Sequence, residues 1–110
     1  MGDEKYLGKV PTECSVEEAN KAARLAVLTR LAVIKSELGS INQVARIVSV
    51  SGFVNAAPDF TDHPQVINGA SDLLVEVFGE LGKHSRTAVG CSSLPLGVAV
   101  EVSLIVEVKP

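Results

Sequence analysis

Two charged residues stand out in an otherwise apolar stretch near the C-terminus. Arg86 and Glu101 each lie in a segment of alternating apolar residues, and no charged side chain separates them. If the chain reverses near Ser93 and Leu94, the two segments pair as a hairpin that places Arg86 and Glu101 close to opposite each other. A guanidinium on a rigid strand can bind a planar carboxylate through two hydrogen bonds, and a nearby glutamate can exchange a proton. The alternative is a structural cross-strand ion pair with no ligand.

Hydrophobic periodicity predicts the elements that would position these residues. A first helix is expected to begin at Ser15, which can form a capping box with Glu18, and to stop at Gly39. Residues 41–55 then alternate with a period of two, which predicts a strand. A second helix is expected from residue 63 or 64 to residue 81, with Asp62 as a possible cap and Pro64 in its first turn. Its apolar stripe comprises Val66, Ile67, Ala70, Leu73, Leu74, Val77, Phe78 and Leu81.

The order helix, strand, helix, strand, strand predicts an α+β fold, with two helices packed on one face of a mixed sheet. Residues 1–110 are expected to form a single domain. In the last strand the even-numbered residues from Val98 to Val108 form an aliphatic face that should pack under the helices. Strand parity assigns Val89 and Cys91 to this same face, and Arg86 and Glu101 to the other. Residues 1–12 are expected to form a short edge strand or a tail.

Composition excludes several classes of function. Hydrophobic residues make up 46% of the chain, yet no apolar run approaches the length of a membrane span, so a subunit interface should bury the excess. The formal net charge of −3 and the absence of Trp argue against nucleic-acid binding. Neither the two cysteines nor the two histidines have metal-site spacing, so no metal site is predicted. Reduced thiols and the absence of a secretion signal in residues 1–9 predict a cytoplasmic protein.

Four motifs give the chain a resemblance to the RidA/YjgF-like reactive intermediate deaminase family, extending from about Gly8 to Val108. The most specific motif is the last, in which the Arg, the Leu-Pro turn and the Glu keep the spacing of the family. The Asn68 stretch is most similar to a longer-chain branch. The motifs are Gly8-Lys9-Val10-Pro11, Ser51-Gly52-Phe53-Val54, Val66-Ile67-Asn68-Gly69-Ala70-Ser71, and Ser85-Arg86-Thr87-Ala88-Val89 through Leu94-Pro95 to Val100-Glu101-Val102.

The resemblance implies a chorismate-mutase-like fold that assembles as a homotrimer with ligand clefts between subunits. Arg86 matches the arginine that grips the substrate carboxylate, and Glu101 matches an acidic residue that positions water or moves a proton. Asn68 matches an asparagine near the cleft. The implied activity is the cofactor-free hydrolysis of 2-imino and 2-enamino acids to 2-keto acids and ammonia.

The chain also departs from the family pattern. Ala88 stands where many members have a cysteine, and the pair of strands that usually precedes the first helix is not present in these 110 residues. A three-stranded sheet with an additional exposed edge is therefore expected. The alternative function is a non-catalytic oligomer of the same fold that binds small carboxylates or acts in regulation.

Overall fold

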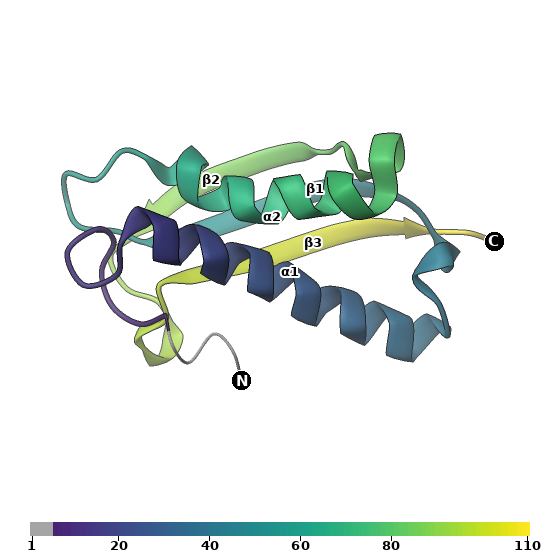
Figure 1. Ribbon diagram of the computed structural model, residues 1–110, viewed down its shortest axis with the longest axis horizontal. Coiled ribbons are helices and arrows are strands. Elements are labelled where there is room, and N and C mark those ends of the chain that lie inside the picture. Colours follow the sequence, from purple (N-terminus) through teal and green to yellow (C-terminus); the bar gives the residue numbers. More distant parts are fainter. Residues whose placement is uncertain (1–5) are drawn as a thin grey trace.

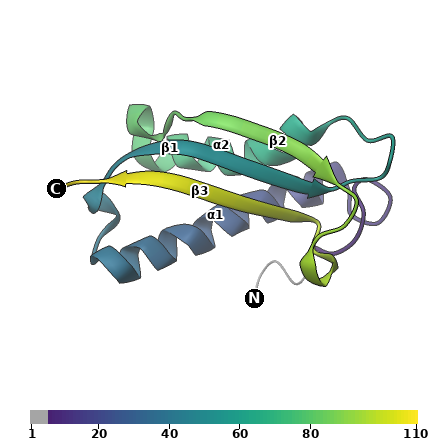
Figure 2. The same ribbon diagram turned by 180° about the vertical axis from the view of Figure 1, so that it is seen from behind.

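The computed structural model of the protein describes residues 6–110, so the expectations for residues 1–5 lie outside the described chain. Two helices lie side by side on one face of a three-stranded sheet (Figure 1), and the view from behind shows the other face of the sheet without a helix (Figure 2). The α+β fold predicted from the sequence is confirmed. The elements are α1 (Val16–Leu38), η2 (Ile41–Gln43), β1 (Val44–Asn55), α2 (His63–Phe78), η3 (Gly79–Gly82), β2 (Ser85–Cys91), η4 (Pro95–Gly97) and β3 (Val100–Val108).

Helix α1 begins and ends where the sequence predicts. The Ser15 hydroxyl accepts a hydrogen bond from the Glu18 backbone, the Glu18 carboxylate accepts one from the Ser15 backbone, and Gly39 closes the helix with φ of 85°. The two helices pack closely because small residues face each other: a Cβ on Gly69 would overlap the backbone carbonyl of Asn20. The apolar side of α1 is buried at Ala19, Ala22, Ala23, Val27 and Leu31.

The pairing of the strands differs from the predicted hairpin. The sheet has the order β2-β1-β3, in which β1 pairs parallel with β2 and antiparallel with β3. The hairpin of residues 85–91 with residues 98–108 is therefore wrong. The connection through η4 is long enough to step over one strand, about 10 Å. This arrangement places β1, whose two faces both carry apolar residues, in the protected centre of the sheet.

The faces of the sheet follow from this register. Val50 and Val54 of β1 are buried under the helices, and their partners Leu104 and Val100 on β3 share that face. The predicted aliphatic face of the last strand is thus confirmed from Val100 to Val106, whereas Val108 is exposed. Irregularities between Val44 and Arg46 and between Ile47 and Ser49 shift the alternation, so Ile47 is fully buried although simple parity placed it on the other face.

Helix α2 ends earlier than predicted. Pro64 lies in its first turn as expected, and Asp62 stands at the N-cap position, but its side chain makes no capping hydrogen bond. The helix stops at Phe78 because Gly79 adopts φ of 60°, and the chain continues as the 3-10 turn η3. As a result Leu81, assigned to the helix stripe, lies in η3 and is exposed.

Residues 6–12 are joined to the rest of the fold by isolated β-bridges. Leu7 forms an antiparallel bridge with Val98, and Val10, which is fully buried, forms a parallel bridge with Ala56. Residues 6–12 therefore make bridges and not the edge strand that was one of the two expectations. Within residues 6–110, neither α-helix combines the length and apolar content that a membrane crossing requires.

Candidate functional site

Arg86 lies on β2 and points toward α2, not into the helix-free face as strand parity predicted. Its partner in the register is Val50, which is buried under the helices, so Arg86 faces the same side. Its Nη1 donates a hydrogen bond to Asn68 Oδ1 at 2.7 Å and a longer one to Ser71 Oγ at 3.3 Å. The sequence assigned Arg86 and Asn68 to one site, and the fold brings these two side chains into contact.

The Arg86 guanidinium has neutral partners only. Within residues 6–110, the ion pairs are Arg24–Glu76, Arg46–Glu107 and Glu80–Lys83, and none of them includes Arg86. Arg86 is exposed, and a guanidinium has five N–H donors, of which Nη1 supplies the two bonds described above. The remaining donors are free to meet a planar anion such as a carboxylate.

Asn68 lies inside α2 and does not cap it. The helix begins at His63, so Asn68 is past the first turn, half-buried, with its side chain directed at β2. Its Oδ1 accepts the Arg86 hydrogen bond and so fixes where the guanidinium lies. The packing of α2 on β1 is tight at this level because Gly52 leaves room for Ile67: a Cβ on Gly52 would lie 2.5 Å from Ile67 Cδ1.

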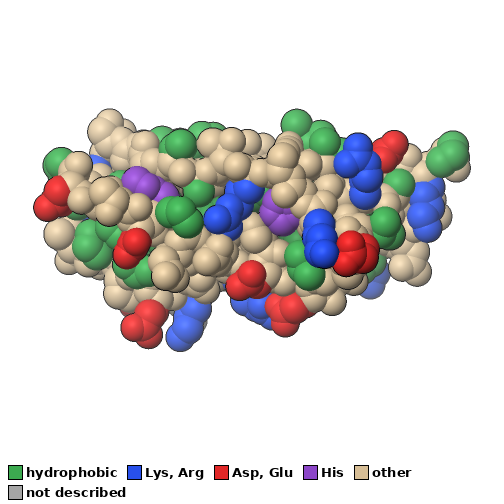
Figure 3. Space-filling view, turned by 90° about the horizontal axis from the view of Figure 1, so that it is seen from above, with side chains coloured by type: hydrophobic (Ala, Val, Ile, Leu, Met, Phe, Trp, Pro, Cys, Tyr) green, Lys and Arg blue, Asp and Glu red, His purple; other side chains and the backbone are tan. Residues whose placement is uncertain are grey.

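Ser71 and His84 complete this cluster, and sequence reasoning missed them as a pair. Ser71 Oγ lies 2.9 Å from His84 Nε2, and His84 Nδ1 lies 2.6 Å from the carbonyl oxygen of Gly82. Both side chains are half-buried. The spacing carried a signal: Ser71 follows Asn68 by three residues on a helix, and His84 precedes Arg86 by two residues at a strand, so each pair shares a face. The side of the molecule formed by α2 and β2 shows a histidine between basic side chains at the surface (Figure 3).

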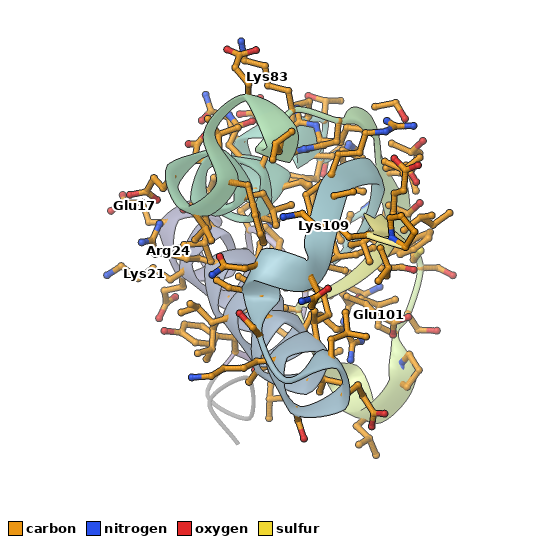
Figure 4. The ribbon with its side chains drawn as sticks, turned by 90° about the vertical axis from the view of Figure 1, so that its right-hand side faces the viewer. Glu17, Lys21, Arg24, Lys83, Glu101 and Lys109 are labelled. Atoms are coloured by element: carbon orange, nitrogen blue, oxygen red, sulfur yellow. The ribbon has the colours of Figure 1, made fainter. Side chains whose placement is uncertain are left out.

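Glu101 lies on the opposite face of the sheet from Arg86. It pairs with Phe53 on β1, whose neighbours Gly52 and Val54 face the helices, so Glu101 and Phe53 face away from them. Figure 4 shows Glu101 on the side of the sheet away from the side that carries Glu17 and Arg24 of α1. The expected proximity of Glu101 to Arg86 within one chain is therefore wrong, because β1 separates the two strands.

A separate cavity of about 430 Å³ lies where β2 ends. Lys9, Phe60, His63 and Cys91 contribute to its lining, and the rings of Phe60 and His63 meet edge to face at 5.2 Å. The three predicted site residues are not among those that line it. The Lys9 ammonium donates to the backbone carbonyl of Ser92, so it is already engaged. Lys9 retains N–H donors as well, but the cluster around Arg86 is the better candidate for a carboxylate because a planar guanidinium can bind one through two parallel hydrogen bonds.

The two cysteines differ in their surroundings. Cys14 is buried, and this burial, together with the nearby Glu18 carboxylate, raises the pKa of its thiol. Cys91 is half-buried on the helix-free side of β2, not in the core as strand parity predicted, because Gly90 beside it is the residue that faces His63. Both thiols are free, and neither touches the cluster around Arg86 among the described contacts.

Comparisons with known proteins agree with the fold and extend over nearly the whole chain. Residues 1–108 match the model of a family described as "YjgF/chorismate mutase-like, putative endoribonuclease". Protein TCP17 of Trypanosoma cruzi is 43% identical over 103 residues, which cover 93% of this chain and 64% of TCP17. The chain thus spans less than two thirds of the length of this relative.

Two crystal structures are similar in both sequence and fold. The protein Atu1372 of Agrobacterium tumefaciens, described as having unknown function, is 40% identical with a TM-score of 0.92, covering 94% of this chain and 67% of its own. A protein described as a putative endoribonuclease from Shewanella oneidensis is 35% identical with a TM-score of 0.89, covering 94% of this chain and 68% of its own. The matched family model and the shared sheet and helix arrangement lead to one conclusion: this chain belongs to the YjgF/chorismate mutase-like family.

Proposed function

We propose that the protein binds a small carboxylate at Arg86 and hydrolyses 2-imino or 2-enamino acids to 2-keto acids and ammonia. The observation that carries the proposal is the Arg86 guanidinium, held against Asn68 on α2, with donors left over and no carboxylate from residues 6–110 in an ion pair with it. Two parallel N–H···O bonds to a substrate carboxylate would fix the adjacent imino carbon in one place. A water molecule could then attack a positioned electrophile instead of a freely diffusing one.

Glu101 takes part in this proposal through assembly. The helix-free face of the sheet bears exposed apolar side chains, including Ile105 at 60% and Val89 at 40% exposure. We propose a homo-oligomer, with a trimer favoured, in which a second copy covers this face and Glu101 of one copy contributes acid/base catalysis to the cleft of another. The protein would act in the cytoplasm, where Cys14 and Cys91 stay reduced.

The proposal is tested by ammonia release from freshly generated 2-iminobutyrate. Arg86→Ala removes a charge-assisted contact worth about 1.5–3 kcal/mol, so KM should rise by roughly one to two orders of magnitude. Arg46→Ala is the matched control, because Arg46 pairs with Glu107 away from the cluster. Equal ammonia release with and without the wild-type protein, or unchanged kinetics in Arg86→Ala, would overturn the proposed activity.

A second candidate function is a non-catalytic carboxylate-binding or regulatory oligomer. It is favoured by the separation of Arg86 and Glu101 on opposite faces of one chain, which leaves the anchor without that acid/base group unless another copy supplies it. This candidate expects saturable binding of 2-keto acids in calorimetry, abolished by Arg86→Ala, without turnover. RNA cleavage, which the family description suggests, has less support because the net charge is −3 and no Trp is present for stacking.

A further inference from the structure

A continuous chain of hydrogen bonds joins the Gly82 carbonyl to the Arg86 guanidinium. It passes from Gly82 O to His84 Nδ1 at 2.6 Å, from His84 Nε2 to Ser71 Oγ at 2.9 Å, and from Ser71 Oγ to Arg86 Nη1 at 3.3 Å. The chain links three elements, since Gly82 ends η3, Ser71 lies on α2 and Arg86 lies on β2. A nucleophile or proton donor beside a base, with the base oriented by a third group, is the arrangement that activates hydroxyls and water.

The chemistry of the partners determines the direction of these bonds. A carbonyl oxygen can only accept, so the proton between Gly82 and His84 is carried by Nδ1. In the neutral imidazole, Nε2 then has a lone pair and accepts a hydrogen bond, which the Ser71 hydroxyl donates. The orientation matches that of a general base whose tautomer is fixed by a backbone carbonyl.

The hydrogen-bond acceptor site that Ser71 leaves unused indicates its role. Its hydroxyl has one donor and two acceptor sites; the donor is used by His84 and one acceptor site by Arg86. One acceptor site is left for a water molecule, which would be held beside the guanidinium. Any carboxylate bound by Arg86 would place its neighbouring carbon close to that water.

We propose that Ser71 and His84 form a proton relay for the water that attacks a carboxylate ligand held by Arg86. This inference rests on the proposed function and adds the proton acceptor that the Arg86 side of the chain otherwise lacks. Ser71 is the residue that contacts the water, and His84 is a positioning residue that orients the Ser71 hydroxyl and takes up the proton through it. Glu101 of another copy, at the far side of the cleft, would remain a separate acid/base group.

The relay balances the hydrolysis of an imine. As the water oxygen adds to the C=N carbon, one water proton passes to Ser71 Oγ while the Ser71 proton passes to His84 Nε2. The electron pair of the C=N π bond moves to nitrogen, and the nitrogen takes a proton from solvent. His84 returns its proton through Ser71 to the nitrogen of the tetrahedral intermediate. The C–N bond then breaks, ammonia leaves, and the hydroxyl loses its proton to solvent as C=O forms. The sum is imine plus water giving ketone plus ammonia.

The test compares His84→Asn and Ser71→Ala with Ser71→Thr in the ammonia-release assay. His84→Asn keeps a donor for the Gly82 carbonyl and removes the base, so kcat should fall by about 10²–10⁴-fold while KM changes little. The kcat of Ser71→Ala should fall by a similar factor. The kcat of Ser71→Thr should stay much closer to that of the wild type because threonine also carries a hydroxyl. Because the two residues act as a unit, the double variant should be no slower than the slower single variant.

Two controls separate catalysis from folding. His63→Asn removes the other histidine, which lines the separate cavity, and should leave kcat unchanged. The acid limb of the pH–kcat profile should disappear in His84→Asn; the charged groups on the elements that meet at His84 include Arg86 of β2, reached through Ser71, Asp72 of α2, and Glu80 of η3 with its partner Lys83. An unchanged kcat in His84→Asn, or a loss of kcat that follows a loss of thermal stability in all three variants, would overturn the relay.

A second measurement judges the relay independently of turnover. If the wild type releases no ammonia, the proposed deaminase activity is refuted but the Ser71–His84 relay is not. Nitrogen-15 spectra of His84 then test the relay. The spectra should show the Nδ1-protonated tautomer, and saturating 2-ketobutyrate should shift the Nε2 resonance in the wild type but not in Arg86→Ala. The opposite tautomer, or an Nε2 resonance that does not shift when the keto acid is added, would overturn the relay.

Discussion

At the scale of single residues, the residue types and spacings in the sequence identify some members of the candidate site and miss others. The family resemblance implies that Arg86 and Asn68 belong to one site, and their side chains meet at 2.7 Å. Ser71 and His84 were not recognised because a serine and a histidine thirteen positions apart are common in any sequence, and only the packing of α2 on β2 brings them to 2.9 Å. Glu101 was placed on the correct strand but beside the wrong neighbour.

At this scale the structure also makes a prediction for Cys14. Burial and the Glu18 carboxylate raise the pKa of its thiol, so the reactive thiolate is scarce in the folded protein. In a Cys91→Ser variant, alkylation of Cys14 by iodoacetamide at pH 8 should be slower in the native protein than in urea by more than about tenfold. Mass spectrometry of timed samples measures both rates. Equal rates in the two conditions would contradict the burial of this thiol.

The elements divide into those specified locally and those specified by packing. Helix α1 was predicted from Ser15 to its stop at Gly39, because a capping box and a left-handed glycine are determined by neighbouring residues. The sequence also predicts where the strands lie, but it does not predict which strands pair. The apolar pattern of β1 allows pairing along both of its edges and does not specify the partner. The register irregularities around Ile47 are likewise invisible to simple alternation.

The capping box makes a prediction for stability against pH. Hydrogen bonds from the Ser15 backbone and side chain lower the pKa of Glu18, so its folded value lies below the value of about 4.3 in an unfolded chain. The stabilisation that Glu18 provides is thus complete above that value and is lost as pH falls through the lowered folded pKa. Thermal melts of the wild type and Glu18→Gln should differ at pH 6 and converge in acid.

Two comparisons make that measurement specific. Glu17→Gln removes a carboxylate from the same turn without removing the capping bond, so its melts should not reproduce the convergence seen with Glu18→Gln. Ser15→Ala should cost about 1 kcal/mol of stability at neutral pH, as expected for the loss of an N-cap. Identical melts for Glu18→Gln and the wild type at pH 6 would show that the charge of Glu18 adds no stability, since a glutamine side chain can still accept the capping bond.

The two faces of the sheet differ in what covers them. The helices cover one face and position Arg86, whereas the other face carries Glu101 among exposed apolar side chains such as Ile105. The proposed assembly joins these two groups of residues from different copies. It therefore predicts an oligomer in light scattering, with three copies favoured, and a monomer at micromolar concentration would contradict it.

Mixed oligomers test the shared site directly. At substrate concentrations below the wild-type KM, Arg86→Ala and Glu101→Gln should each release ammonia at only a small fraction of the wild-type rate, because each lacks one half of every cleft. When equal amounts are denatured and refolded together, a cyclic trimer forms sites with both native residues in about a quarter of its clefts. Ammonia release near a quarter of the wild-type rate should follow. No recovery in a correctly assembled mixture would show that the two residues do not act together across subunits.

The sequence by itself determined the helices, the approximate strands and the α+β class, and the resemblance of its motifs to a known family supplied the candidate pair Arg86 and Asn68. These depend on periodicity, on caps and on motif spacing, all of which are local along the chain. Only the tertiary structure decided that β1 lies between β2 and β3, that Arg86 and Glu101 face opposite sides, and that Ser71 and His84 stand beside the guanidinium. Strand order and helix placement are set by which apolar faces can be buried together, and that is a property of the whole fold.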